Sequence, residues 1–371
     1  MPDVYDLAVV IAWSRVNLLP MPGARLLQLL LLLFIASFAS GDGHPSPLSC
    51  ASLPNAAPRT RPAKVFDGFT FDDELDLLLV RMRLLSAVVF KFVVVEAVVT
   101  HAGQPKRLVF QDNRAMFAEF EMQVLHVALD SLPQQPDACA PGNSSCSYST
   151  HWMREGGQRN AIMAAIEQYC AQHASSSASS SSYSSSACSS DDIVLVSDVD
   201  ELPRPEAVRQ LQHCAGFNFP VALAMRMHYY TVNSVWLDEE GNTWPWTHAK
   251  AAPLSLLRLP QHSPYALRLN NPPPRMTLQN AGWHFSYFGG VATIVKKIRH
   301  LAHQENNRPE IVEESHVLRC ILQHEDLFRR DIVVGAARYF LAPSDDQVLS
   351  DLPSDLPASW YHSAYLQQDE M

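Results

Sequence analysis

Two aspartates that lie one residue apart, Asp198 and Asp200, follow a short apolar run and could hold a metal ion. The run, residues 193–196, is aliphatic and too short for a helix, which predicts a buried strand. Pro203 and Pro205 then favour the start of a helix. The two acids therefore stand just past the carboxyl end of a strand, where open α/β sheets bind ligands. Carboxylates with this spacing can hold Mg²⁺ or Mn²⁺, and the ion can hold a diphosphate.

The competing interpretation of these two acids is a strand-to-helix turn that binds no metal. Aspartate is favoured in turns and at helix caps for purely local reasons, and Asp200 lies close to the predicted helix start. An EF-hand loop is excluded, because its central glycine and its terminal glutamate are both missing. The other residues that could do chemistry must therefore help to decide.

A second stretch, residues 281–290, places His284 among aromatic residues and ends in two glycines. Such a stretch suits a sugar-binding surface or a metal site, since imidazole binds Mn²⁺ alongside carboxylates. A histidine satisfied within the core is the alternative. Arg159 could bind a phosphate through its guanidinium, although an exposed helix arginine is usually only solvated. Glu96 lies inside an apolar run, where an acid is usually paired but can also line a site.

The elements that must position these residues alternate between helices and strands. Residues 74–85 place Leu75, Leu78, Met82 and Leu85 on one helical face. The remaining predicted elements are a helix at 152–169 and strands at 87–99, 107–110, 124–128 and 221–230. Strands alternating with helices predict an α/β fold with a mostly parallel central sheet.

Composition narrows the class of partner. The chain has 371 residues, of which 47% are hydrophobic, so it can build a large core. Its formal charge is −10, and it has no basic block, which argues against nucleic acid as a partner. An acidic protein that binds a diphosphate needs a cation to bridge the like charges, and this favours a metal.

The N-terminus has the pattern of a targeting segment. Residues 26–39 are almost wholly apolar and follow Arg15 and Arg25. As a helix they would span about 21 Å, less than the roughly 30 Å hydrocarbon core of a bilayer. Small residues near 39 offer a cleavage site, so both a signal peptide and a short signal anchor stay open. Either one sends the bulk of the chain into the secretory lumen and connects it, at least transiently, to a membrane.

The expected domain organisation follows from these composition shifts. It comprises an N-terminal cytoplasmic or targeting region at 1–25, a signal anchor or signal peptide at 26–40, a Pro- and Ser-rich stem at 41–63, a catalytic domain at 64–342 with a serine-rich insertion at 175–190, and a C-terminal tail at 343–371.

Seven cysteines show neither a C-x-x-C pair nor a zinc-binding spacing. In an oxidising lumen some should form disulfides, and Cys139 with Cys146 is the nearest candidate pair. The odd number leaves at least one thiol free or bonded to another chain. Asn143 begins a glycosylation sequon between these two cysteines.

Together these stretches resemble glycosyltransferase family 17 over roughly residues 64–310. The strings around the acid pair and around the aromatic stretch are specific in combination. The matching pieces are, in order, Phe66 to Phe69 with Asp67, Glu74 to Asp76, Arg81, Phe92 to Glu96, Gln158 to Ile162, Asp192 to Pro205, Gly282 to Gly290, and Lys297, Ile298, His303 and Glu305.

The resemblance implies a GT-A-like nucleotide-sugar-binding fold and metal-dependent, inverting transfer. The donor would be UDP-N-acetylglucosamine, and the acceptor would be a mannose of an N-glycan on a glycoprotein, joined in β-1,4 linkage. It also implies a Golgi membrane protein with a luminal catalytic domain, or a secreted protein if the signal is cleaved. Mn²⁺ or Mg²⁺ would be held by Asp198 and Asp200, completed by His284.

The expected site residues have separate roles. Asp67, Arg159, Asn160 and Trp283 would contact the donor together with the acid pair, and Tyr287 would stack on a sugar. Inversion by single displacement needs one base for the acceptor hydroxyl. Glu305, Glu201 and Glu96 are all eligible, and Glu305 is favoured because it follows the aromatic stretch.

Two other functions fit parts of the sequence. A haloacid-dehalogenase-type phosphohydrolase also ends a strand in D-x-D, but here the motif lies in mid-chain and Leu202 stands where that class usually has Thr or Val. A non-catalytic luminal carbohydrate-binding protein would need the aromatic stretch and no metal. The intact acid pair argues mildly against it.

Overall fold

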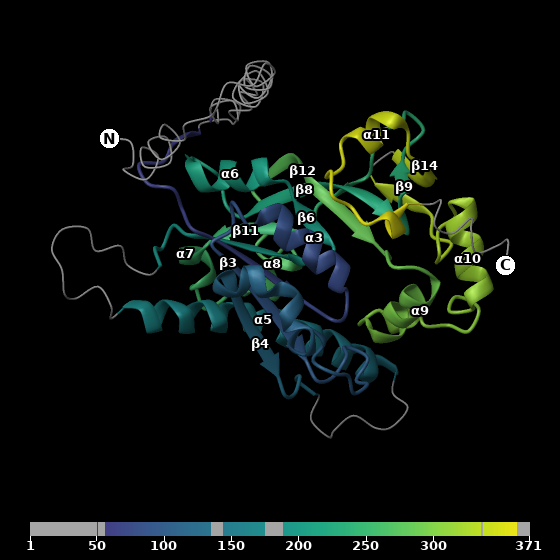
Figure 1. Ribbon diagram of the computed structural model, residues 1–371, viewed down its shortest axis with the longest axis horizontal. Helices are drawn as coiled ribbons and strands as arrows, with labels where there is room; N and C mark the ends of the chain where they lie inside the picture. The colour runs from purple at the N-terminus through teal and green to yellow at the C-terminus, as the bar shows by residue number, and fades with distance from the viewer. Residues whose placement is uncertain (1–49, 51–55, 135–143, 175–187, 335–336, 362–371) are drawn as a thin grey trace, which may run out of the picture. The chain divides into compact units, whose positions relative to one another are not determined.

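The computed structural model of this chain describes Cys50 and residues 56–134, 144–174, 188–334 and 337–361 (Figure 1). Within these residues, the central feature is a 12-stranded sheet in the order β13-β14-β9-β8-β11-β5-β2-β3-β4, with β10 and β12 beside β8 and β6 beside β12. A separate pair joins β1 (Ala57–Pro58) to β7 (Cys214–Ala215).

One half of the large sheet is parallel. It consists of β2 (Val65–Thr70), β3 (Lys91–Ala97), β4 (Val124–Leu129) and β5 (Ile193–Asp198). Strand β2 lies between β3 and β5, and the register aligns its last residue with Asp198. The carboxyl ends of these strands therefore meet at one edge, and the acid pair lies at that edge.

The other half of the sheet is largely antiparallel. Its strands are β6 (Glu201–Pro203), β8 (Val221–Tyr229), β9 (Thr231–Leu237), β10 (Pro245–Trp246), β11 (Lys250–Pro253), β12 (Met276–Ser286), β13 (Ile332–Val334) and β14 (Ala337–Pro343). Only the β8–β12 pair is parallel among the pairings described for these strands.

The expectation of a mostly parallel sheet is therefore wrong, and the sheet is mixed. The physical reason is the length of the connections. A parallel pair needs a crossover of a dozen or more residues, whereas a short link forces the chain to turn back. Strand β9 follows β8 after Tyr230 alone, and the two strands run antiparallel.

Helices cover both faces of the parallel half. The helical segments are α3 (Leu75–Leu85), α4 (Val109–Asp112), η3 (Arg114–Gln123), α5 (Ser144–Ala174), α6 (Pro205–His213), α7 (Leu254–Leu257), α8 (Pro264–Arg268), α9 (Val291–His300), η5 (Gln304–Asn306), α10 (Glu314–Gln323), α11 (Asp346–Ser350) and η6 (Ala358–Trp360). Helix α3 packs on one face of β3 and α5 on the other.

The core explains why the central strands are apolar throughout. Successive side chains of a strand point to opposite faces, and here both faces are covered. On β3, Phe92 and Val94 pack with α3, while Val93 and Val95 pack with Ile162 of α5. The predicted helices at 74–85 and 152–169 and the strands near 124–128, 193–196 and 221–230 are confirmed.

One predicted strand is wrong. Residues 107–110 do not form a strand, because α4 begins at Val109. The carboxylate of Glu96 accepts hydrogen bonds from the backbone N–H groups of Phe110 (3.0 Å) and Gln111 (2.9 Å). A buried acid therefore satisfies the start of this helix, which a local sequence pattern does not reveal.

Two disulfides join distant parts of the described chain. Cys50 bonds to Cys214, and Cys170 bonds to Cys188. The first disulfide and the β1–β7 pair fix Cys50 and residues 57–58, part of the expected stem, to the domain. Cys320 is buried and unpaired. The predicted Cys139–Cys146 bond involves a cysteine outside the described residues.

The predicted anchor or signal at 26–40 and most of the serine-rich insertion also lie outside the described residues. In the part of the chain that the structure describes, no helix is both long enough and apolar enough to cross a bilayer.

Candidate functional site

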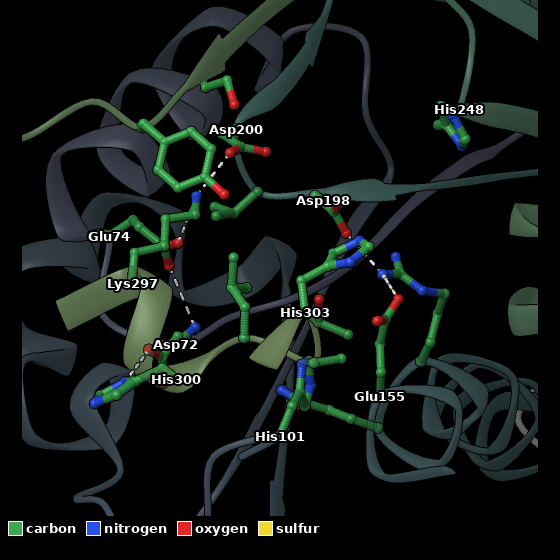
Figure 2. A pocket seen from close by; sticks show the side chains of 18 of the residues that line it. Asp72, Glu74, His101, Glu155, Asp198, Asp200, His248, Lys297, His300 and His303 are labelled. Atoms are coloured by element: carbon green, nitrogen blue, oxygen red, sulfur yellow. Dashed lines mark hydrogen bonds and ion pairs between the residues drawn. The ribbon is translucent and has the colours of Figure 1, made fainter. Parts of the chain in front are cut away.

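A pocket of about 470 Å³ opens where the carboxyl ends of the parallel strands meet (Figure 2). Segments that follow β2, β3 and β5 line it, as do the last residues of β8 and β12. Helix α5 contributes Arg159, α8 contributes Arg268, and α9 contributes Lys297. The parallel edge and three helices thus deliver charged side chains to one cavity.

Asp198 is held in the pocket by two arginines. Its Oδ1 accepts from Nη2 of Arg159 at 2.7 Å, and its Oδ2 accepts from Nη2 of Arg268 at 2.5 Å. Burial raises the pKa of Asp198, but the two guanidinium groups outweigh it and hold the pKa well below its usual value. The side chain keeps 33% of its surface exposed. The carboxylate is therefore ionised, and part of its surface stays accessible.

Asp200 has a different environment. Its Oδ2 accepts from Nζ of Lys297 at 2.8 Å, whereas its Oδ1 is buried and has no hydrogen-bond partner among the described residues. Nε2 of His284 lies 3.6 Å from that oxygen, which is too long for a hydrogen bond. Burial raises the pKa of Asp200, but Lys297 and His284 outweigh it and lower the pKa.

Strand pairing brings His284 to Asp200. Strand β6 runs antiparallel to β12, and the register sets Glu201 opposite His284. The backbone N–H of Phe285 donates to the carbonyl of Asp200 at 2.9 Å. Two of the three predicted metal ligands are thus neighbours through backbone hydrogen bonds.

Arg81 holds the loop that carries the acid pair. Its Nη1 donates to the carbonyl oxygens of Asp198 (2.9 Å), Val199 (3.2 Å) and Glu201 (2.7 Å). Its Nε and Nη2 donate to the carboxylate of Asp67 at 2.8 and 2.6 Å, and both side chains are fully buried. Asp67 was expected to contact the donor. It is not among the residues that line the pocket, and its carboxylate accepts from Arg81, which holds the loop.

Trp283 and Asn160 were also expected to contact the donor, and the structure places neither among the residues that line the pocket. Trp283 is buried against Arg204, whose guanidinium lies 4.0 Å from the ring centre. Asn160 is exposed and accepts a hydrogen bond from the backbone N–H of Tyr265. Arg159 and Tyr287 both line the pocket.

The three candidate bases have different environments. Glu96 caps α4 and also contacts His126 at 2.8 Å, away from the pocket lining. Glu201 is fully buried and accepts from Arg268 and from Nε1 of Trp246. Glu305 is 47% exposed and does not line the pocket itself, but its Oε1 lies 2.6 Å from Nδ1 of His303, which does.

Several residues that build the pocket carry no sequence signal. Arg268 ends a five-residue helix, and no spacing links it to Asp198. Trp152, Glu155, His248 and Arg330 also line the cavity. Glu74, Lys297 and His303 also line the pocket and could have been proposed from the sequence, because each lies in a piece that resembles the family.

Charge in the pocket is balanced. Five acids line it, Asp72, Glu74, Glu155, Asp198 and Asp200, and so do five basic residues, Lys106, Arg159, Arg268, Lys297 and Arg330, which gives 5 − 5 = 0. Five histidines also line the pocket. A diphosphate would therefore bring excess negative charge into a neutral cavity, and a divalent cation would compensate it.

The side chains of the pocket could supply some of the ligands that such an ion needs. The partnerless Oδ1 of Asp200 and the Nε2 of His284 are suitable ligand atoms that face each other. Among the described residues, no group of three or more His, Cys, Asp or Glu side chains could hold an ion alone. In Mg²⁺ sites, one or two carboxylates are usually joined by water and substrate phosphates.

Comparisons with known proteins identify the family. The model of glycosyltransferase family 17 matches residues 46–331. Enzymes named β-1,4-mannosyl-glycoprotein 4-β-N-acetylglucosaminyltransferase from Rattus norvegicus and Homo sapiens are 27% identical over 193 residues, and that from Mus musculus is 26% identical. The match covers 51% of this chain but only 31% of each relative. No solved structure matches the chain. Since the family model spans most of its length, the chain belongs to glycosyltransferase family 17.

Proposed function

We propose that this chain is a metal-dependent, inverting N-acetylglucosaminyltransferase. It would move N-acetylglucosamine from UDP-N-acetylglucosamine to a mannose of a glycoprotein N-glycan, in β-1,4 linkage. The names of the relatives support the sugar and the acceptor class. The observation that carries the proposal is the buried, partnerless Oδ1 of Asp200 facing His284 in a charge-balanced pocket.

The residues around the acid pair suit a departing diphosphate. An ion held by Asp200 and His284 supplies positive charge to the UDP leaving group when it is bound. Arg159 and Arg268 donate hydrogen bonds to the other acid, Asp198. A guanidinium has five N–H donors in a planar fork that matches phosphate oxygens. These two arginines would bind and orient the phosphates. Asp198 stays a proposed ligand, although both of its oxygens already accept hydrogen bonds from the arginines.

The proposal extends to fold type and location. The acids at the carboxyl edge of β2, β3 and β5 support a GT-A-like nucleotide-sugar site. The two disulfides support passage through an oxidising compartment, since disulfides are rare in the cytosol. We therefore propose a Golgi membrane protein with a luminal catalytic domain, with secretion as the alternative. Protease protection with carbonate extraction distinguishes these locations.

Mass spectrometry of reaction products tests the function. The full-length chain, purified in detergent, is incubated with UDP-N-acetylglucosamine and free N-glycans, with Mn²⁺ or with a chelator. We expect an acceptor mass increase of one N-acetylhexosamine that requires Mn²⁺. Asp200→Asn keeps the shape but removes the charge, and it should lower transfer by at least about 10²-fold, because ion–phosphate contacts supply several kcal/mol.

Other outcomes of this assay contradict the proposal. Transfer that is unaffected by the chelator would remove the metal. Hydrolysis of an aryl phosphate without sugar transfer would favour a phosphohydrolase. Glycan binding without turnover, unaffected by the chelator, would favour a non-catalytic carbohydrate-binding protein.

A further inference from the structure

The carboxylates that line the pocket are poorly suited to act as a base. Each of them contacts a cationic or imidazole partner. Asp198 contacts Arg159 and Arg268; Glu155 contacts Arg159; Asp200 contacts Lys297; Glu74 contacts Lys297; Asp72 contacts His300 and Lys106. A cation beside a carboxylate stabilises its ionised form and so weakens it as a proton acceptor. In Glu74, burial and the neighbouring acids outweigh Lys297 and raise the pKa, but its side chain is only 10% exposed to an incoming acceptor. The base for an inverting transfer is therefore better sought among the imidazoles.

Three of the five histidines that line the pocket are less suitable as a base, because of their contacts or their burial. His101 lies with Nε2 2.8 Å from the side-chain oxygen of Gln158. His284 faces Asp200 at the proposed ion site. The ring of His248 lies tilted against that of Trp246, and burial lowers the pKa of His248 to about 4, so it is a weak base at neutral pH. His300 and His303 remain, and each has a carboxylate beside Nδ1.

His303 is the more accessible of the two. Its side chain is 53% exposed, whereas that of His300 is 14% exposed and lies against Asp72. In Figure 2, His303 lies between the side of the pocket that carries Asp198 and the side that carries His101. A hydroxyl of a bulky glycan can approach an exposed imidazole more easily than a buried one.

The turn around His303 fixes the orientation of its ring. Nδ1 lies 2.6 Å from Oε1 of Glu305, and an ionised carboxylate only accepts, so Nδ1 carries the proton. Nε2 is then left with the free electron pair that a base needs. The side chain of Gln304 donates to the carbonyl of Leu301 at 2.7 Å, and this ties the turn to the end of α9.

An aromatic side chain, that of Trp152, lies beside this imidazole. The rings of Trp152 and His303 lie edge to face with their centres 4.6 Å apart, and both residues line the pocket. Indole faces suit the apolar faces of sugar rings. The acceptor sugar and the proton-accepting nitrogen can therefore share one side of the cavity.

We propose that Nε2 of His303 accepts the proton of the acceptor hydroxyl, while Glu305 acts as a positioning residue and Trp152 contacts the acceptor sugar. This inference rests on the proposed transferase function. The acceptor oxygen forms a bond to the anomeric carbon, and its proton moves to Nε2. The bond from that carbon to the β-phosphate oxygen breaks, and its electron pair leaves with UDP. Glu305, first expected to be the base itself, instead holds the ring.

Transfer kinetics on the full-length chain test the proposal. We expect His303→Ala to lower kcat by about 10²- to 10⁴-fold, the usual contribution of a general base. UDP binding, measured by calorimetry with Mn²⁺, should be unchanged. Added imidazole should restore part of the activity of His303→Ala, which a purely structural role would not allow. Glu305→Gln should lower kcat by a smaller factor and leave the KM for donor unchanged.

Two matched variants complete the design. His213→Ala removes an exposed imidazole from α6, outside the pocket lining, and should behave as wild type. His300→Ala removes the competing imidazole. Full activity of His303→Ala, or a loss confined to His300→Ala, or the absence of rescue by imidazole overturns the proposal. In each case the wild type still transfers sugar, so these failures differ from failure of the proposed function, in which the wild type forms no product.

Discussion

Arg81 and Asp67 form a fully buried ion pair of two hydrogen bonds directly beneath the loop that carries the acid pair. Arg81 also donates to three carbonyl oxygens of that loop. One arginine thus joins a β2 residue to the backbone on both sides of Asp200. Asp67 therefore supports the loop through Arg81, and it is not among the residues that line the pocket.

Replacing Arg81 by methionine should destabilise the protein strongly. The change leaves the Asp67 carboxylate buried without its cation, and breaking a buried pair in this way costs about 3–5 kcal/mol. Urea denaturation measures the loss in the free energy of unfolding. Arg258→Met, which breaks an exposed pair with Glu167, is the control and should cost less than about 1 kcal/mol. Equal losses in the two variants would show that Arg81 does not support the loop.

Gly282→Ala should disturb the pairing of β6 with β12. A Cβ at Gly282 would lie 2.3 Å from the backbone oxygen of Leu202, which cannot rotate away. At Gly68 the nearest atom is a methyl of Ile162 at 2.5 Å, which belongs to a side chain that can shift. We expect Gly68→Ala to lower the free energy of unfolding by about 1–3 kcal/mol, and we expect Gly282→Ala to lower it by more.

Mn²⁺ binding by these two glycine variants gives a second measurement. Because the pairing of β6 with β12 sets His284 beside Asp200, Gly282→Ala should also weaken Mn²⁺ binding, measured by calorimetry below the unfolding temperature. Gly68→Ala should leave Mn²⁺ binding intact. Normal Mn²⁺ affinity in folded Gly282→Ala would contradict the role of this strand pair.

The sequence predicts the local parts of this site and not the contacts between distant segments. Strand β5 and its two acids were predictable, because an aliphatic run followed by acids is a local pattern. Arg268 was not, since its contact with Asp198 joins residues 70 positions apart through a short helix. Strand β6 has only three residues, which are too few to show a periodicity. The pairing of β6 with β12 that brings His284 to Asp200 could therefore not be predicted.

Stability should fall in mild acid because of His228. This histidine is fully buried, and burial lowers its pKa to about 3, whereas an unfolded histidine has a pKa of about 6.5. Between these values the unfolded state binds a proton that the folded state does not, so stability decreases as the pH falls from about 6.5 towards 3. The slope from this one group is at most about 1.4 kcal/mol per pH unit.

His228→Asn is the test of this slope. The ring Nδ1 donates to the carbonyl of Val232 at 3.0 Å, and an asparagine amide can keep that bond without titrating. Urea denaturation at pH 7.5, 6 and 5 should show a smaller loss in the variant than in the wild type. Parallel curves for the two proteins would mean that His228 does not contribute.

The two disulfides should stabilise the fold unequally. The cysteines of the Cys50–Cys214 bond are 164 residues apart, and those of the Cys170–Cys188 bond are 18 apart. In the chain-entropy treatment the longer loop is worth about 5 kcal/mol and the shorter about 3 kcal/mol. Paired Cys→Ala variants, compared by denaturation under identical buffer, should follow this order. A reversed order would show that native contacts, and not loop length, dominate.

We propose that the carboxylate of Asp200 and the imidazole of His284 bind the ion that holds the donor diphosphate. The most direct measurement is a crystal structure of the protein with Mn²⁺ and UDP, with the ion located by its anomalous scattering. We expect an anomalous peak within bonding distance of Asp200 and His284, with the diphosphate beside Arg159 and Arg268. A manganese ion or a diphosphate bound outside this pocket would contradict it.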